Sequence, residues 1–426
     1  MRLVTALFLA AALLPAQVRR DRHVVIISID GFPAFSLRDP ALPVPNLRRL
    51  AAAGAFADGG METVNPAVTW PNHTSMITGV RPARHGVIYN GLPVRGEGGI
   101  PVKLEPWADK DKLVLSPTLY DVAFKAGLTT GEIDWVAITN PGTITYSFAE
   151  VPKVDAACVK EMIAAGGVSE AEVSGFRSLN IVMRDELWTR AAEHMIEKHK
   201  PNLLLFHTLT TDSSQHQYGA GSLGGNSALA LADARVGRVL DAIQRAGIQD
   251  STTVIVVSDH GFRSYKASIN PLDRLPADIA KDVFSFPEGG TAMIYIRSSR
   301  RAELTPRVRA IFAASGDGIA SVVGPEDFGK LGYPDLEKSD RMADLVLAAT
   351  PGYTFGGRSG ASTGGSHGYL STDSDMDAIF IASGAGVRPG VKLGKIRNLD
   401  VAPTAAKLLG LEMSDIEGKP LTAALR

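Results

Sequence analysis

The sequence predicts an α/β fold with a mostly parallel central sheet, and two observations carry that prediction. First, three short apolar runs, over residues 23–29, 202–209 and 252–258, read HVVIISI, NLLLFHTL and TTVIVVS. Strands buried on both faces of a parallel sheet have such continuous apolar runs, whereas half-exposed strands alternate. Second, segments with the periodicity and end signals of helices lie between these runs, as helical connections between parallel strands require.

The other predicted elements follow from local signals. Residues 180–199 carry apolar side chains on one helical face, and residues 227–246 do the same up to a stop at Gly247. Further helices are predicted over 46–53, 116–125, 301–314 and 400–409, and further strands over 130–133, 291–296 and 378–382.

Two stretches, 262–290 and 297–366, fit this rhythm poorly because they are rich in glycine, proline, serine and charged residues. We interpret them as insertions beside the site, within one domain of residues 18–426, and not as a separate domain.

The composition excludes some classes of protein. The chain has 426 residues, 45% of them apolar, which is enough for a large core. Its 44 Lys and Arg residues against 45 Asp and Glu give a net charge of −1, so we expect no binding of nucleic-acid duplexes by bulk charge. Because Cys158 is the single cysteine, no intramolecular disulfide can form, and a metal site must use oxygen and nitrogen ligands.

The N-terminus is typical of a secretory signal peptide. Arg2 precedes an apolar stretch over 3–14, and Pro15, Ala16 and Gln17 end it, which predicts a signal peptide of residues 1–17 cleaved near Ala16. The apolar stretch is too short to span a bilayer, and no later run is long enough, so we expect no stable membrane span. The protein is therefore predicted to be secreted or periplasmic.

The segment 68–79, VTWPNHTSMITG, contains the candidate nucleophile. Pro71 is favoured in the first turn of a helix, which places Thr69 at or just before the helix N-terminus. The free N–H groups and the positive dipole end favour an anion there. Thr69 is thus placed like a nucleophile for a phosphate, with Asn72 one turn on as a hydrogen-bond donor; the alternative is an ordinary N-cap threonine.

Three aspartates suggest a metal centre. Asp30, Asp212 and Asp259 each follow one of the three apolar runs. In open α/β sheets ligands bind at the carboxyl ends of the strands, so these carboxylates should converge in one crevice. Unpaired, they would repel one another and be costly to bury, and a divalent cation is the usual resolution.

Three histidines join this set. His216 lies four residues after Asp212, on the same face of a helical turn, and His260 directly follows Asp259 at a strand end. His367 lies in the glycine-rich sequence GGSHGY. Mixed imidazole and carboxylate ligands suit zinc, with manganese or iron as alternatives. Each piece alone is also typical of an ordinary turn, cap or loop residue.

The order of these motifs resembles the alkaline phosphatase superfamily, and more closely its nucleotide pyrophosphatase/phosphodiesterase (type I phosphodiesterase) branch. The resemblance implies an alkaline-phosphatase-like three-layer α/β/α fold, with inserted loops or a subdomain near the active site. It also implies two Zn²⁺ per chain, held by the following groups: Asp212, His216 and His367 on one ion, and Asp30, Asp259, His260 and the Thr69 oxygen on the other.

The same resemblance places Asn72 beside the phosphoryl oxygens. Trp70 stands where the family usually has an aromatic residue, commonly phenylalanine, that lines the leaving-group or base pocket. Tyr89, Trp135 and Tyr146 are candidates for the opposite face of that pocket, although each could be a packing residue, and Trp70 itself could simply pack at the helix start.

These features together predict a secreted two-metal hydrolase that cleaves phosphodiester or pyrophosphate bonds, in nucleotide-like substrates, through a phospho-threonine intermediate. The nucleophile segment 68–79 contains no arginine or lysine for the extra charge of a monoester, which favours a diester. The alternatives are a phosphate monoesterase or a phosphonoacetate hydrolase-like enzyme on the same two-metal site. A non-enzyme alternative is an inactive secreted binding protein of the same fold.

Overall fold

The computed structural model describes residues 17–426, so the predicted signal peptide lies outside the described residues except for Gln17. Within residues 17–426, no helix has both the length and the hydropathy needed to cross a membrane.

The central sheet of the described chain has eight strands in the order β18-β2-β17-β9-β1-β8-β6-β7. The three predicted apolar runs form its centre: β1 (His23–Ile29) pairs in parallel with both β8 (Leu203–Thr208) and β9 (Thr252–Val257). Outward from this centre lie β6 (Thr130–Ile133) and β7 (Tyr146–Phe148) on one side, and β17 (Phe380–Gly384), β2 (Ala55–Phe56) and β18 (Val391–Lys392) on the other. Only β17 breaks the parallel order at the centre, because it runs antiparallel to β9 and to β2. The predicted mostly parallel sheet is confirmed.

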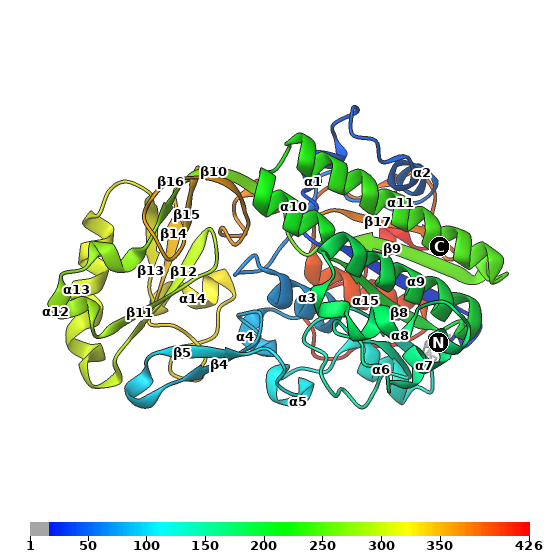
Figure 1. Ribbon diagram of the computed structural model, residues 1–426, viewed down its shortest axis with the longest axis horizontal. Helices are drawn as coiled ribbons and strands as arrows, with labels where there is room; N and C mark the ends of the chain where they lie inside the picture. Colours follow the sequence, from blue (N-terminus) through cyan, green and yellow to red (C-terminus); the bar gives the residue numbers. More distant parts are fainter. Residues whose placement is uncertain (1–16) are drawn as a thin grey trace, which may run out of the picture.

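Helices cover both faces of this sheet (Figure 1). On one face lie α2 (Pro45–Ala53), α9 (Ile181–His199) and α11 (Leu223–Arg245); on the other lie α3 (Thr69–Thr78), α6 (Leu119–Lys125) and α15 (Val401–Leu408). Alternate residues of β1 enter the two cores: Val25 and Ile27 pack in the α9 and α11 layer, Val24 and Ile26 in the α3 and α15 layer. This is the three-layer α/β/α architecture that the resemblance implied.

Capping residues explain where two predicted helices begin. The helix predicted over 116–125 begins at Leu119, because the Thr118 side chain accepts a hydrogen bond from the Asp121 N–H and the Asp121 carboxylate accepts one from the Thr118 N–H. The helix predicted over 227–246 begins earlier, at Leu223, where Ser222 caps it.

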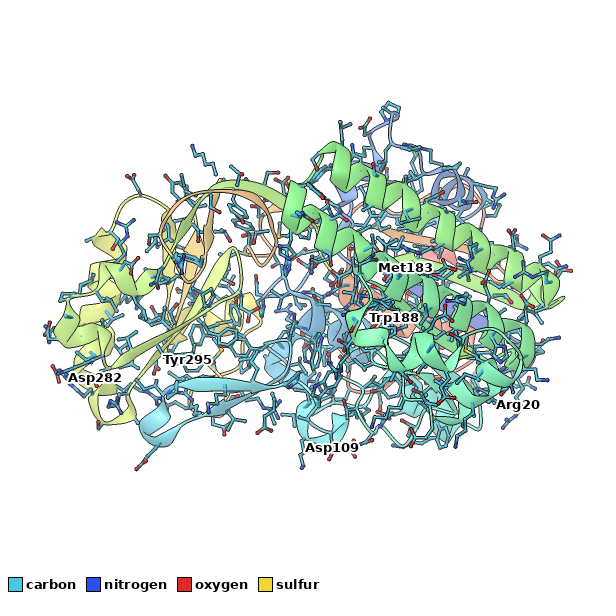
Figure 2. All side chains as sticks on the ribbon, in the orientation of Figure 1. Arg20, Asp109, Met183, Trp188, Asp282 and Tyr295 are labelled. Atoms are coloured by element: carbon cyan, nitrogen blue, oxygen red, sulfur yellow. The ribbon has the colours of Figure 1, made fainter. Side chains whose placement is uncertain are left out.

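A second lobe lies beside the central sheet (Figure 1, left). It contains a four-stranded sheet of β11 (Val283–Pro287), β12 (Thr291–Ile296), β14 (Leu345–Ala349) and β13 (Ile319–Val323), packed against α13 (Arg301–Ala314). A three-stranded sheet of β15 (Tyr353–Phe355), β10 (Arg263–Ile269) and β16 (Gly360–Ser366) joins this lobe to the central part. The stretches that fitted the sequence pattern poorly thus fold together with β12 around a core of their own. Figure 2 labels one buried side chain in each part: Tyr295 in the lobe, and Trp188 on α9 beside the central sheet.

The remaining strands and α-helices are short. They are α1 (Ala34–Leu37), β3 (Met61–Glu62), α4 (Pro82–His85), β4 (Leu92–Arg95), β5 (Val102–Glu105), α5 (Lys110–Leu113), α7 (Ala157–Ala164), α8 (Glu170–Ser174), α10 (Thr210–Tyr218), α12 (Ala277–Ala280), α14 (Pro325–Leu331) and β19 (Ile396–Arg397).

Candidate active site

Three aspartates meet at the carboxyl edge of the central sheet. Asp30 follows β1, Asp259 follows β9 by two residues, and Asp212 lies in the first turn of α10, directly after β8. Since β1, β8 and β9 are parallel neighbours, their carboxyl ends share one edge. The Gly31 N–H donates to Asp259 Oδ1 at 3.0 Å, which joins the ends of β1 and β9 directly.

The histidines complete two adjacent groups. His260 Nε2 lies 3.4 Å from Asp30 Oδ1 and 3.2 Å from Asp259 Oδ2. Asp212 Oδ1 lies 3.3 Å from His216 Nε2, one helical turn away on α10, and 3.6 Å from His367 Nε2. The structure therefore brings all six predicted metal ligands together.

The lobe delivers His367 to this site. Strand β10 leaves the central part just after His260, and β16 returns beside it, with Arg263 opposite Ser366. His367 follows Ser366, so its ring stacks on His260, with centroids 3.8 Å apart. An antiparallel pair of strands in the lobe thus closes a site that is otherwise built by the central sheet.

Backbone carbonyls orient the three histidine rings. The Nδ1 atom of His216 donates to the Gly365 carbonyl at 3.0 Å, and that of His260 donates to the Gly261 carbonyl at 3.1 Å. The Nδ1 atom of His367 donates to the Ala67 carbonyl at 3.1 Å. With the proton held on Nδ1, each Nε2 turns its lone pair toward the carboxylates. This is the usual arrangement of a histidine that binds a metal.

Burial keeps two of these rings neutral. It lowers the pKa of His260 to about 4 and, together with the neighbouring His260, that of His367 to about 3. Burial and the charges of Asp259 and Asp212 raise the pKa of Asp30 well above its usual value. For Asp212, burial opposes ionisation, but the neighbouring His216 imidazole outweighs burial and lowers the pKa of Asp212 to about 2.

The unpaired atoms of the site fit metal ions. Among residues 17–426, Asp30 Oδ1, Asp212 Oδ1, Asp259 Oδ2 and His260 Nε2 are buried and have no hydrogen-bond partner. Buried polar atoms without partners are costly, and four such atoms, three carboxylate oxygens and one imidazole nitrogen, lie together here. Donor atoms of Asp212, His216 and His367 lie within 4.8 Å of one another, and so do those of Asp30, Asp212 and His260. Carboxylate and imidazole donors in two such sets match two zinc-like cations.

Thr69 is the first residue of α3, as predicted, with Val68 extended before it. The carbonyl of Ala67, two residues earlier, holds His367. One turn later, His73 Nδ1 donates to the Thr69 carbonyl at 2.9 Å and lies 3.6 Å from Asp259 Oδ2. The Thr69 segment therefore contacts both groups of candidate ligands.

Asn72 is engaged inside the protein. Its amide donates to the carbonyls of Pro66 at 3.1 Å and Val68 at 2.8 Å, and its oxygen accepts from the Val64 N–H and the Asn398 amide, both at 2.8 Å. Both amide hydrogens are therefore already donated to backbone carbonyls, and the side chain is fully buried. Its predicted contact with phosphate stays a prediction, and these bonds give it a structural task in holding the turn before Thr69.

Asn90 is a residue that the sequence reading did not single out. Its side-chain oxygen accepts a hydrogen bond from the Trp70 N–H at 2.9 Å, and the residue is exposed. The contact fixes the side-chain amide of Asn90 beside the first turn of α3, and none of the hydrogen bonds within residues 17–426 uses its amide hydrogens. A lone asparagine in a glycine-rich stretch gives no signal in sequence, because this contact joins residues twenty positions apart.

His207 is a second residue to which none of the sequence motifs points. It lies on β8, where Nε2 is 3.1 Å from Asp30 Oδ2 and Nδ1 is 3.1 Å from Asp134 Oδ2. Burial alone would lower the pKa of His207, but the charge of Asp134 and its bond outweigh burial and raise it well above the usual value. The His207 imidazole thus holds the Asp30 oxygen that does not contact His260.

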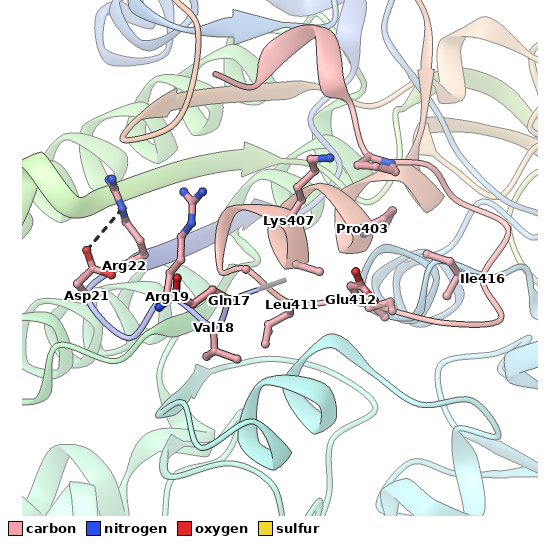
Figure 3. Close-up of a pocket in the computed structure, with 14 residues that line it drawn as sticks. Gln17, Val18, Arg19, Asp21, Arg22, Pro403, Lys407, Leu411, Glu412 and Ile416 are labelled. Carbon is pink, nitrogen blue, oxygen red and sulfur yellow. Dashed lines mark ion pairs between the residues drawn. The ribbon is translucent and has the colours of Figure 1, made fainter. Parts of the chain in front are cut away.

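Trp70 borders a cavity of about 800 Å³ whose lining also includes Trp107, Trp135 and Tyr146. Trp135 and Tyr146 were candidates for the opposite face of a leaving-group pocket, and the structure places both in this lining. Tyr89 instead packs in the lobe core, edge-on to Phe286. A second cavity, of about 840 Å³, lies between residues 17–22 and the α15 end of the chain (Figure 3). Its lining shares no residue with the predicted site, and we assign it no role in catalysis.

Comparison with known proteins identifies the family. The family model for type I phosphodiesterase / nucleotide pyrophosphatase matches residues 24–370. The chain belongs to this family. Mouse ectonucleotide pyrophosphatase/phosphodiesterase family member 7 is 25% identical to it, over 97% of this chain and 90% of the relative. Human member 1 is 23% identical, over 91% of this chain and 40% of the relative.

A solved structure shares the fold. Murine ectonucleotide pyrophosphatase/phosphodiesterase 5, as an inactive threonine-to-alanine variant in complex with AMP, superposes with a TM-score of 0.75 and 18% identity, covering 95% of this chain and 100% of that one. The resemblance stated from the motifs is thereby confirmed, in family and in fold. The family consists of metal-dependent hydrolases of phosphodiester and pyrophosphate bonds, and the type I phosphodiesterase assignment makes this chain an enzyme of that class.

Proposed function

We propose that this member of the family is a secreted two-zinc hydrolase that cleaves phosphodiester or pyrophosphate bonds in nucleotide-like substrates through a phospho-threonine intermediate. One observation carries the proposal: buried, unpaired donor atoms of Asp30, Asp212, Asp259 and His260 gather next to the helix that begins at Thr69. The predicted signal peptide and the name "ectonucleotide" of the relatives support secretion.

Two sets of residues would hold the ions. Asp212, His216 and His367 would bind one, and the other would be bound by Asp30, Asp259 and His260 together with the Thr69 hydroxyl. When bound, such ions lower the pKa of a coordinated hydroxyl and neutralise charge on the phosphoryl oxygens. Zinc suits this mixture of imidazole and carboxylate ligands best, and manganese or iron could replace it.

The chain's own residues then carry out a displacement in two halves. Thr69 Oγ1 attacks phosphorus, the bond to the leaving group breaks, and the phosphoryl group is transferred to Thr69. Water next attacks the phospho-threonine, and the Thr69 oxygen departs as the leaving group. The N-terminus of α3 faces the negative charge that builds up in both halves.

Two asparagines would have different roles, one in contact with the phosphate and one in holding the turn before Thr69. Asn90 is oriented by its bond from the Trp70 N–H, and it would donate its amide hydrogens to a phosphoryl oxygen. Asn72 would hold the 64–68 turn so that Thr69 points at the phosphate, in place of the direct donation that its spacing suggests. His207 would keep Asp30 in its orientation.

The cavity beside Trp70 would hold the leaving group or base. Trp70, Trp135 and Tyr146 offer flat apolar faces in its lining, and a nucleobase or an aromatic alcohol can stack on such faces. The AMP bound by the murine structural neighbour agrees with a nucleotide-like substrate.

The test is a paired rate comparison on the purified, zinc-loaded chain. We expect bis-p-nitrophenyl phosphate and p-nitrophenyl thymidine monophosphate to be cleaved faster than p-nitrophenyl phosphate and a sulfate ester by orders of magnitude. A preference for the monoester would move the protein to a phosphatase function with the same metal centre. Bound zinc without hydrolysis of any of these esters would point to a phosphonate substrate or a binding role.

Substitution of the nucleophile tests the intermediate. Thr69→Ala should remove turnover and leave the zinc content and thermal unfolding of the protein close to wild type, because the six other proposed ligand side chains remain. Full activity in Thr69→Ala would overturn the assignment. Thr74→Ala, in the same helix, serves as the matched control.

A further inference from the structure

A third group of metal-binding side chains lies outside the candidate active site. Glu161 on α7 accepts contacts from two histidines near the end of α9: Glu161 Oε1 is 3.1 Å from His194 Nε2, and Glu161 Oε2 is 3.0 Å from His199 Nε2. All three donor atoms lie within 4.8 Å of one another. The proposed reaction uses none of them.

Helical spacing alone does not produce this convergence. His194 and His199 are five residues apart, so on a regular helix their side chains leave the axis about 140° apart. Both nevertheless turn their Nε2 atoms to the same carboxylate, that of Glu161 on α7. Tyr146 stacks on the His199 ring with centroids 4.0 Å apart and holds its orientation.

The distances fit a tetrahedral ion. With zinc bonds of about 2.0–2.1 Å to nitrogen and about 2.0–2.2 Å to oxygen, the edges of a tetrahedron are about 3.3 Å long. The two Glu161 contacts, one to each carboxylate oxygen, are within a few tenths of an ångström of that edge. The contacts of Asp212 with His216 and of His260 with Asp259 in the active site are equally close to it.

The surroundings leave a position open for a further ligand. The side chains of His194 and His199 are each 16% exposed and that of Glu161 is 33% exposed, so the group is half-buried and an ion can reach it. Glu161 and His199 also line the cavity of about 800 Å³ that Trp70 borders. An ion held by these three residues would keep a free position for water or for an anionic group in that cavity.

We propose that Glu161, His194 and His199 form a third metal site, which takes a first-row divalent ion of the zinc type and is separate from the two catalytic ions. Two imidazoles and one carboxylate are a donor set that zinc, but not calcium or magnesium, prefers. The ion would tie α7 to the end of α9 across the cavity wall. The competing explanation is a metal-free network in which both imidazoles donate Nε2–H to Glu161.

Metal counting separates the two explanations. The full chain is loaded with zinc, freed of loose metal, and analysed by inductively coupled plasma mass spectrometry. We expect three zinc ions per wild-type chain and one fewer in Glu161→Gln, which keeps the shape of the side chain but binds zinc poorly. Glu172→Gln is the matched control, because Glu172 pairs with Arg190 on α9 at 2.6 Å with the same 33% exposure, and it should keep three.

A second measurement on the wild-type chain covers the case in which Glu161→Gln fails to fold. Diethyl pyrocarbonate modifies accessible neutral histidines, and peptide mass mapping reports each one. We expect zinc to protect His194 and His199, while His23, outside the group, reacts equally with and without zinc.

Each outcome is decisive for the third site. Two zinc ions in both wild type and Glu161→Gln, with His194 and His199 equally reactive under both conditions, would overturn it. That result would leave the proposed function intact, because hydrolysis of bis-p-nitrophenyl phosphate reports on the catalytic ions independently.

Discussion

Asn72 and Asn90 should respond to the same substitution in opposite ways. Asn72→Ala would remove the acceptor of two buried donors, the Val64 N–H and the Asn398 amide. Each buried donor left without a partner costs about 1–3 kcal/mol, so we expect the free energy of unfolding to fall by about 2–6 kcal/mol. For a cooperative unit of about 410 residues the entropy of unfolding is about 0.9 kcal/mol per kelvin, so Tm should fall by about 2–7 °C.

Asn90→Ala should instead lower the rate. The side chain is exposed, and its loss leaves the Trp70 N–H at the mouth of the site, where water can reach it. Loss of one donor to the transition state typically lowers kcat by about 10²–10³. We therefore expect a drop of that size on bis-p-nitrophenyl phosphate, with a change in stability within about 0.5 kcal/mol.

The assay pairs thermal unfolding of the zinc-loaded protein with kcat measured well below Tm. Asn226→Ala on α11 controls for the loss of an asparagine elsewhere. The reasoning would be refuted if Asn72→Ala kept the wild-type Tm and lost activity while Asn90→Ala stayed active. That result would return the phosphate contact to Asn72, where the spacing of the nucleophile segment first placed it.

Three further predictions concern the pocket, a buried carboxyl group and the metals. Trp70→Ala should raise KM for p-nitrophenyl thymidine monophosphate by about 5–150-fold, since stacking on a base is worth about 1–3 kcal/mol. Trp70→Phe should bring KM back toward the wild-type value. An equal rise in KM for a substrate without a base would contradict the stacking role. Burial raises the pKa of Glu132 to about 7, so this carboxyl group binds its proton more tightly in the folded chain than in the unfolded one. Its contribution to stability is thus present below about pH 4.5 and lost as the pH rises through 7. In urea unfolding, the free energy of unfolding of Glu132→Gln minus that of wild type should therefore be about 3 kcal/mol larger at pH 8 than at pH 4.5. Removal of metal with a chelator should abolish hydrolysis and lower Tm by about 10 °C, because two sites at about a thousand times Kd contribute about 8 kcal/mol; an unchanged Tm in differential scanning calorimetry would argue against a buried two-metal centre.

The central strands, and the convergence of the aspartates that follow them, could be predicted from sequence because their signals are local. Continuous apolar runs marked β1, β8 and β9, and an aspartate follows each run. Parallel strands end at one edge, so the convergence of Asp30, Asp212 and Asp259 followed from topology without any side-chain detail. The signal for the helix that begins at Thr69 was equally local, since Pro71 is favoured in the first turn of a helix.

The lobe was harder to predict for a physical reason. Its strands pair with partners that are distant in sequence: β12 pairs with β14, which lies some fifty residues further along the chain. Glycines and charged residues in 297–366 mask short strands that become buried only after α13 packs on them. Sequence patterns therefore indicated insertions, and only the fold reveals that they and β12 build one unit.

The amino-acid sequence by itself determined which candidate chemical groups this protein carries: a threonine at a helix start and six candidate metal-ligating side chains, three of them aspartates that follow the central strands. Tertiary structure decided which polar side chains are free to use that chemistry. The Asn72 side chain makes four internal hydrogen bonds, whereas the amide hydrogens of Asn90 stay available. Glu161 contacts His194 and His199 only because α7 packs beside α9. Residue type and spacing fix what a side chain can do, but its hydrogen-bond partners come from distant segments, and those are set only when the chain has folded.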